Sequence, residues 1–103
     1  MLSVTCFVAK GLNTSCTLVG GHSYILFEDD GSLVKLNEVG SFVWNAIAGD
    51  RTISEIIRSC LSEFDGDKEE IQQSVLEFLE QLLQMRAIAI SEIEFTGVMQ
   101  YGN

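Results

Sequence analysis

The chain has 103 residues and carries 6 Lys+Arg against 15 Asp+Glu, which gives a formal charge of −9. That length suits a single domain with one core, and no apolar run is long enough to span a bilayer. The charge disfavours nucleic acids and anionic membranes, because both attract basic side chains. It keeps a small protein soluble or helps to attract a basic or neutral peptide or protein.

The amino-terminal segment and the cysteines predict a cytoplasmic protein. Residues 1–10 have no basic segment ahead of their apolar residues, an order that a secretory signal requires. Cys6, Cys16 and Cys60 are odd in number and lack C-x-x-C spacing. They therefore predict neither a disulfide framework nor a structural zinc site, and they fit a reducing compartment.

The first third of the chain predicts strands. The strongest strand signal is Ser23–Glu28, and Asp29-Asp-Gly31 after it supplies the residues of a tight hairpin. On the returning strand, alternation places Val34 and Leu36 on one face, with Leu33 and Lys35 on the other. The expected strands are Val4–Ala9, Cys16–Val19, Ser23–Glu28 and Ser32–Leu36.

From Asn37 the apolar spacing becomes helical. Asn37 is an N-cap residue, and Gly49 is the expected C-cap of the first helix. Thr52-Ile-Ser-Glu55 is a capping box that opens a second helix, closed by Asp65-Gly66. A third helix starts at Asp67-Lys-Glu-Glu70 and runs to about Met85. Ile88–Ile90 then predicts a strand, with Ile93–Phe95 as an extension, and Gly97–Asn103 is expected to fray.

The third helix has a wider apolar arc than core packing requires. One stripe is enough for a core, and a second flank continues it around the helix. This flank comprises Gln72, Leu76, Leu79 and Leu83. Either the helix is central and touches two neighbouring elements, or the flank lines a groove that is open to a ligand.

The sequence offers no catalytic or metal-binding constellation. The single histidine, His22, lies in the turn Gly20-Gly-His-Ser23 and has no partner at ligand spacing. Asp29-Asp30 followed by Gly31 predicts a turn rather than a metal loop. Cys60 falls in a helical apolar stripe as a core thiol. We therefore expect no enzyme activity, no metal and no cofactor.

Several of these residues occur together in a known family. The pattern Leu36-Asn-x-x-Gly40-x-x-x-Trp44, followed by Gly49-x-x-Thr-x-x-Glu55-Ile, resembles the PqqD-like family, named after the coenzyme PQQ synthesis protein D. The resemblance covers about residues 16 to 90 of what we interpret as one domain, residues 1–103.

The resemblance implies a fold and a function. Family members join a three-stranded antiparallel sheet to three helices in an α+β, winged-helix-turn-helix-like arrangement, to which this chain adds a further terminal strand. They bind the leader of a ribosomally synthesised precursor peptide as an added strand, and they present it to a modifying enzyme such as a radical SAM enzyme or a leader peptidase. Here that implies a peptide site formed by Leu33, Val34, Lys35, Leu36, Gln72, Leu76, Leu79 and Leu83.

Two alternatives remain at this stage. A winged-helix regulator would bind DNA, but it requires arginines and lysines on its recognition helix, and the third helix offers only Lys68 at its start and Arg86 beyond its end. A structural module would form a homodimer through the leucines of the third helix. The strand at Val4–Ala9 leaves the edge order of the sheet undecided, because it could occupy the groove or join two copies.

Overall fold

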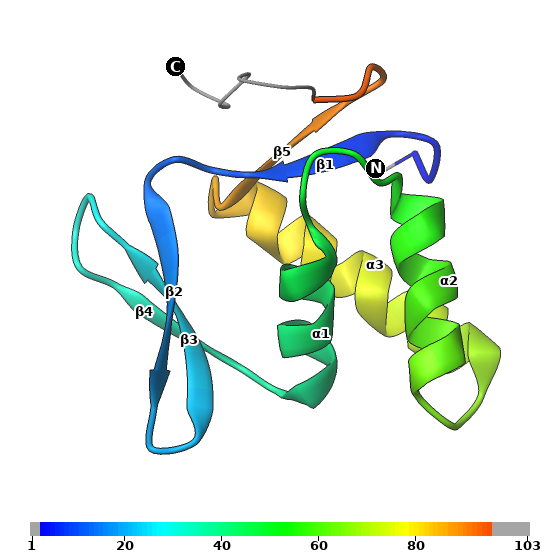
Figure 1. Ribbon diagram of the computed structural model, residues 1–103, viewed down its shortest axis with the longest axis horizontal. Helices are drawn as coiled ribbons and strands as arrows, with labels where there is room; N and C mark the ends of the chain where they lie inside the picture. The colour runs from blue at the N-terminus through cyan, green and yellow to red at the C-terminus, as the bar shows by residue number, and fades with distance from the viewer. Residues whose placement is uncertain (1–2, 96–103) are drawn as a thin grey trace.

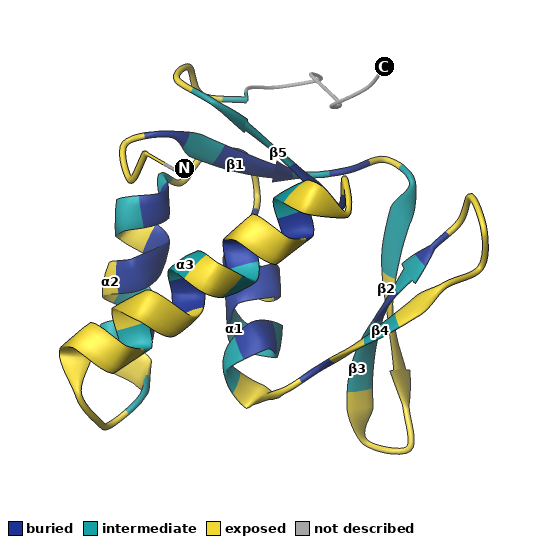
Figure 2. Ribbon diagram, turned by 180° about the vertical axis from the view of Figure 1, so that it is seen from behind, coloured by how far each residue is buried: buried dark blue, intermediate teal, exposed yellow. Residues whose placement is uncertain are grey.

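The computed structural model describes residues 3–95, which form two small sheets and three helices (Figure 1). In both views of the molecule, the three-stranded sheet and α2 lie on opposite sides of α1 and α3 (Figures 1 and 2). The elements are, in chain order, β1 (Phe7–Lys10), β2 (Thr14–Val19), β3 (His22–Phe27), β4 (Leu33–Leu36), α1 (Glu38–Ala46), α2 (Ile53–Glu63), α3 (Lys68–Gln84) and β5 (Ile88–Ser91).

The larger sheet is antiparallel and has the order β2-β3-β4. On β3, Ile25 and Phe27 are buried, and Val34 and Leu36 of β4 share their face because Ile25 lies opposite Val34. Leu33, on the other face, is 55% exposed. The alternation expected for β4 is therefore confirmed, and the helices cover one face of the sheet.

Side chains of the expected type cap all three helices. Asn37 Oδ1 accepts the N–H of Gly40 at 2.7 Å. Thr52 and Glu55 form the predicted capping box at the start of α2. Asp67 Oδ1 accepts the N–H of Glu69 at 2.8 Å. Each cap satisfies amides that have no partner within the helix, and a cap of this kind stabilises a helix by about 1 kcal/mol.

The core lies where the helices meet the buried face of the sheet. Trp44 of α1 is 1% exposed, and Cys60 of α2 and Val75 of α3 are fully buried. Phe42 and Phe64 meet edge to face, with ring centroids 5.5 Å apart, and so join α1 to the end of α2. Burial raises the pKa of Cys60, as expected of a core thiol.

The amino-terminal strand pairs with the carboxy-terminal strand. β1 and β5 form a separate antiparallel sheet in which Val8 lies opposite Ile90. On the other edge of β1, Val8 accepts the N–H of Gly49 at 2.9 Å and donates to the carbonyl of Arg51 at 3.3 Å. Lys10, at the end of β1, lies 5.0 Å from the centre of the Trp44 ring. Desolvation by burial lowers the pKa of Lys10, and attraction to Cys16 partly opposes this.

The structure changes several predicted boundaries. α1 ends at Ala46 with Ile47 as its C-cap, and Gly49, which has a φ of +89°, donates its N–H to Val8 of β1 instead. Residues 93–95 are not a strand, although Phe95 donates its N–H to Gly49 at 2.9 Å. The predicted fraying of residues 97–103 lies outside the described residues. Within residues 3–95, each helix is too short or too polar to cross a membrane.

Candidate functional site

The open edge of β4 is the first component of the site. Phe27 donates its N–H to the carbonyl of Ser32 at 2.9 Å, and these two residues continue the register in which Leu26 lies opposite Leu33. Hydrogen-bonded and non-hydrogen-bonded pairs alternate along an antiparallel ladder. Val34 and Leu36 therefore bond to β3, whereas the N–H and C=O groups of Leu33 and Lys35 point away from it.

No other strand of the described chain pairs with this edge. β4 has β3 as its one partner in the sheet, and it also packs against α1. The amino-terminal strand, which was a candidate to occupy this position, instead lies between β5 and residues 49–53. Two N–H and two C=O groups at Leu33 and Lys35 are thus available to an extended segment from another molecule.

A flank of α3 is the second component. A Cβ atom built on Gly40, in the first turn of α1, would lie 3.4 Å from Cζ of Phe78, so α3 approaches the junction of β4 and α1 closely through this ring. Ser74, Phe78 and Gln81 share one flank at helical spacing. We call Ser74, Phe78, Gln81 and Met85 the Phe78 flank. Phe78 is half-buried, and Met85 is an exposed apolar side chain.

The structure places the predicted α3 residues elsewhere. Leu79 is fully buried in the core. Leu76 is two residues from Phe78 and therefore lies about 160° away around the helix axis. Leu83 and the exposed Gln72 lie on the side of Leu76 as well. Gln72, Leu76 and Leu83 therefore lie on a different side of α3 from Phe78, the residue that approaches α1. Of the predicted β4 residues, Leu36 is only 4% exposed and belongs to the core.

The sequence contained one indication of the approach between α1 and α3. Gly40 occupies the first turn of a helix, where glycine lowers helix stability. A glycine at this position leaves room for another side chain beside the backbone of α1, and Phe78 of α3 approaches there. Phe78 is half-buried, so it packs against the core and also borders the surface.

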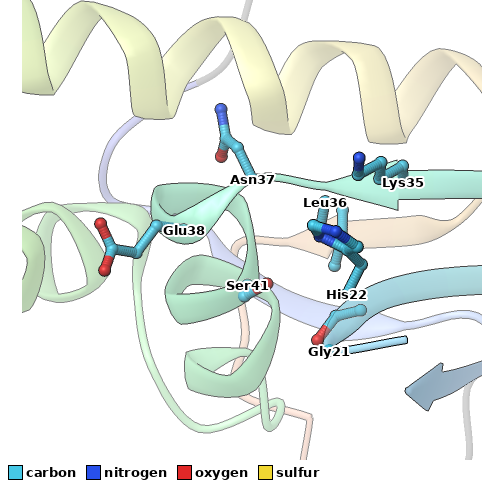
Figure 3. Close-up of a pocket in the computed structure, with 8 residues that line it drawn as sticks. Gly21, His22, Lys35, Leu36, Asn37, Glu38 and Ser41 are labelled. Carbon is cyan, nitrogen blue, oxygen red and sulfur yellow. The ribbon is translucent and has the colours of Figure 1, made fainter. Parts of the chain in front are cut away.

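A hollow lies where β4 passes into α1. It has a volume of about 550 Å³ and is bordered by the start of β3, the end of β4 and the first turn of α1. Figure 3 shows His22, Lys35 and Ser41 around it, with the side chain of Glu38 directed away from His22 and Lys35. An extended segment on the β4 edge would have one end next to this hollow.

Acidic side chains surround the site. Residues 28–38 contain Glu28, Asp29, Asp30 and Glu38, and Lys35 is the single cation among them. Asp30 is charged at neutral pH, and hydrogen bonding by the side chain and the backbone of Ser32 lowers its pKa below the ordinary value. α3 adds four glutamates and one lysine. This charge is unsuitable for a helix that enters a DNA groove.

The fold and this edge define a class: a small α+β domain in which three capped helices support a three-stranded sheet with an open edge strand. The family described as Coenzyme PQQ synthesis protein D (PqqD) matches residues 23–88, so this chain belongs to that family. The match runs from β3 through α3 and includes the β4 edge and the Phe78 flank.

A solved structure shares the fold. It is described as TbiB1 in complex with the TbiA(beta) leader peptide, and it is 18% identical to this chain with a TM-score of 0.67. The alignment covers 78% of this chain and 93% of that one. No curated protein sequence matches the chain.

Proposed function

We propose that this protein recognises the leader of a ribosomally synthesised precursor peptide and presents it to a modifying enzyme. The leader adds to β4 as a fourth strand, beside the Phe78 flank of α3. The main support for this proposal is that the N–H and C=O groups of Leu33 and Lys35 point away from β3 and can bond to an added strand. Membership of the PqqD family, and a structural neighbour that was solved with a leader peptide, support it.

The edge and the flank have different roles in binding. Four backbone hydrogen bonds at a net of about 1 kcal/mol each give an affinity that depends little on sequence. Two apolar anchors against Val34 and Phe78, at roughly 1.5–3 kcal/mol each, select the peptide. Ordering a flexible leader costs about 2–5 kcal/mol. The difference is at most about 8 kcal/mol, which corresponds to a dissociation constant near 1 μM.

The protein acts without chemistry of its own. It raises the effective concentration of the precursor at a partner such as a radical SAM enzyme or a leader peptidase. No cofactor is required for strand addition. The three cysteines are unpaired thiols, as a reducing compartment leaves them, which supports a cytoplasmic location.

Two proline variants test the proposal. The probes are fluorescein-labelled 15-residue peptides tiled across the short reading frames encoded beside this gene. Lys35→Pro removes one outward N–H and places a ring on the open edge, where proline is tolerated by a sheet. Leu18→Pro makes the same change on the outer edge of β2. We expect at least one peptide to bind the native protein, Lys35→Pro to weaken it at least tenfold, and Leu18→Pro to leave it unchanged.

Two results would contradict the proposal. One is that Lys35→Pro keeps its circular dichroism spectrum and binds the peptide as the native protein does. The other is that Leu18→Pro weakens binding as strongly as Lys35→Pro.

A further inference from the structure

The second open edge of the sheet, on β2, has an unusual composition. Residues 11–27 contain no Asp, Glu, Lys or Arg, in a chain that has 15 acidic and 6 basic residues. Edge strands are usually protected from pairing by charges, proline or bulges. β2 has none of these, since its six residues pair with β3 in continuous register. β4, in contrast, carries Lys35.

The hydrogen-bond pattern identifies which groups of β2 face outward. Glu28 donates its N–H to the carbonyl of Asn13 at 2.8 Å, in register with the pairing of Thr14 to Phe27. By alternation, the N–H and C=O groups of Cys16 and Leu18 point away from β3. The outward N–H of Thr14 is already bonded to Gly11 at 3.3 Å, which leaves its carbonyl available.

Exposed apolar side chains accompany these groups. Leu18 is 70% exposed and Val19 is 55% exposed. Cys16 is exposed as well, although it lies opposite the buried Ile25 and shares its face. The helices therefore do not reach across to β2, and the strand presents both an unpaired backbone and an apolar side chain to solvent.

We propose that β2 pairs with β2 of a second copy, antiparallel and about a two-fold axis. A second copy fits because this strand is complementary to itself: outward groups occur at even-numbered positions, so each can bond to its counterpart in the other chain. It also fits because the chain carries a formal charge of −9, and an uncharged strand lets two copies approach without placing carboxylates against each other. Cys16 lies directly opposite Cys16 of the partner subunit, or is offset by one pair.

The assembly joins two three-stranded sheets into one sheet of six strands with the order β4-β3-β2-β2-β3-β4. Leu18 of each copy covers the facing strand on the side of the helices, because opposite residues share a face. Both β4 edges remain at the outer ends. Dimerisation through β2 therefore does not depend on the peptide-binding function and leaves two separate peptide sites.

Sedimentation velocity and thiol cross-linking of the full chain test this pairing. We expect the dimer fraction to rise between micromolar and millimolar concentrations. A short bismaleimide should link two native chains through Cys16, and Cys16→Ser should prevent the link and still sediment as a dimer. Leu18→Glu replaces the apolar side chain that covers the facing strand with a carboxylate in each copy, and should weaken the dimer at least tenfold. Ile93→Glu is the matched control, because Ile93 is 77% exposed outside the sheets and should leave the dimer unchanged.

Several results would overturn the proposal. These are a monomer across the whole concentration range, a dimer that Leu18→Glu leaves intact, or a dimer that Ile93→Glu disrupts equally. Amide exchange gives a second measurement that needs no variant: the N–H groups of Cys16 and Leu18 should become protected as the concentration rises. Protection that does not change with concentration would also refute the pairing, whereas peptide binding at β4 would be unaffected.

Discussion

The two flanks of α3 should differ in their effect on peptide binding. Phe78 and Leu76 are both half-buried and both pack against the core. Truncating a fully buried residue of either type costs about 2–5 kcal/mol, so each half-buried side chain should contribute about 1–2 kcal/mol to folding. Phe78→Ala and Leu76→Ala should therefore lower the free energy of unfolding by similar amounts, measured by urea denaturation.

The two variants should differ in their affinity for the peptide. The Phe78 ring approaches the first turn of α1, which directly follows β4, and losing an apolar anchor of roughly 1.5 kcal/mol weakens binding about tenfold. Leu76 lies on the opposite side of the helix, so Leu76→Ala should leave the affinity for the peptide unchanged. Fluorescence anisotropy with a labelled peptide that binds the native protein measures both. If Leu76→Ala weakened binding and Phe78→Ala did not, the peptide would lie on the other flank, and our assignment of the groove would be refuted.

Three further predictions concern the fold. Replacing a helical glycine by alanine usually stabilises by about 1 kcal/mol. Gly40→Ala should not raise the melting temperature, because its Cβ would lie only 3.1 Å from the capping oxygen of Asn37 and in contact with Phe78. A clear rise would contradict the tight contact with the cap. An aromatic disulfide reagent at neutral pH should label the exposed Cys16 rapidly. It should label the buried Cys6 and Cys60 only on unfolding, and burial also raises the pKa of Cys60. Rapid labelling of a second thiol in the folded protein would contradict the burial of these two side chains. Arg86 has a φ of 64° just after α3, a conformation that glycine adopts without steric cost. Arg86→Gly should therefore stabilise the folded protein by up to about 1 kcal/mol, measured by thermal unfolding. A loss of stability would contradict this prediction.

Local chemistry made most of the fold predictable. Asn37, Thr52 and Asp67 cap their helices because their side chains reach amides only two or three residues away. The turn after Phe27 and the alternation along β4 are equally local, and both follow from residue type and spacing. Such interactions can be inferred from a short stretch of sequence because they require no knowledge of the rest of the chain.

The parts that sequence reasoning missed depend on distant contacts. Periodicity defines the apolar arc of α3, but which part of the arc faces the core depends on tertiary packing, in which Val75, Leu79 and Leu82 are buried. Gly49, the expected C-cap, instead bonds to Val8 and Phe95, which lie far away in sequence. The partner of β1 is β5, at the other end of the described chain. Each of these contacts decides which surfaces remain open for binding.

Amide hydrogen exchange followed by NMR tests the central claim most directly. In the free protein, the N–H groups of Val34 and Leu36 should exchange slowly because they bond to β3, and those of Leu33 and Lys35 should exchange rapidly. A bound peptide should slow the exchange of Leu33 and Lys35 and leave the other two unchanged. Slowing that appears elsewhere while Leu33 and Lys35 continue to exchange rapidly would show that the peptide does not bind as a strand on β4.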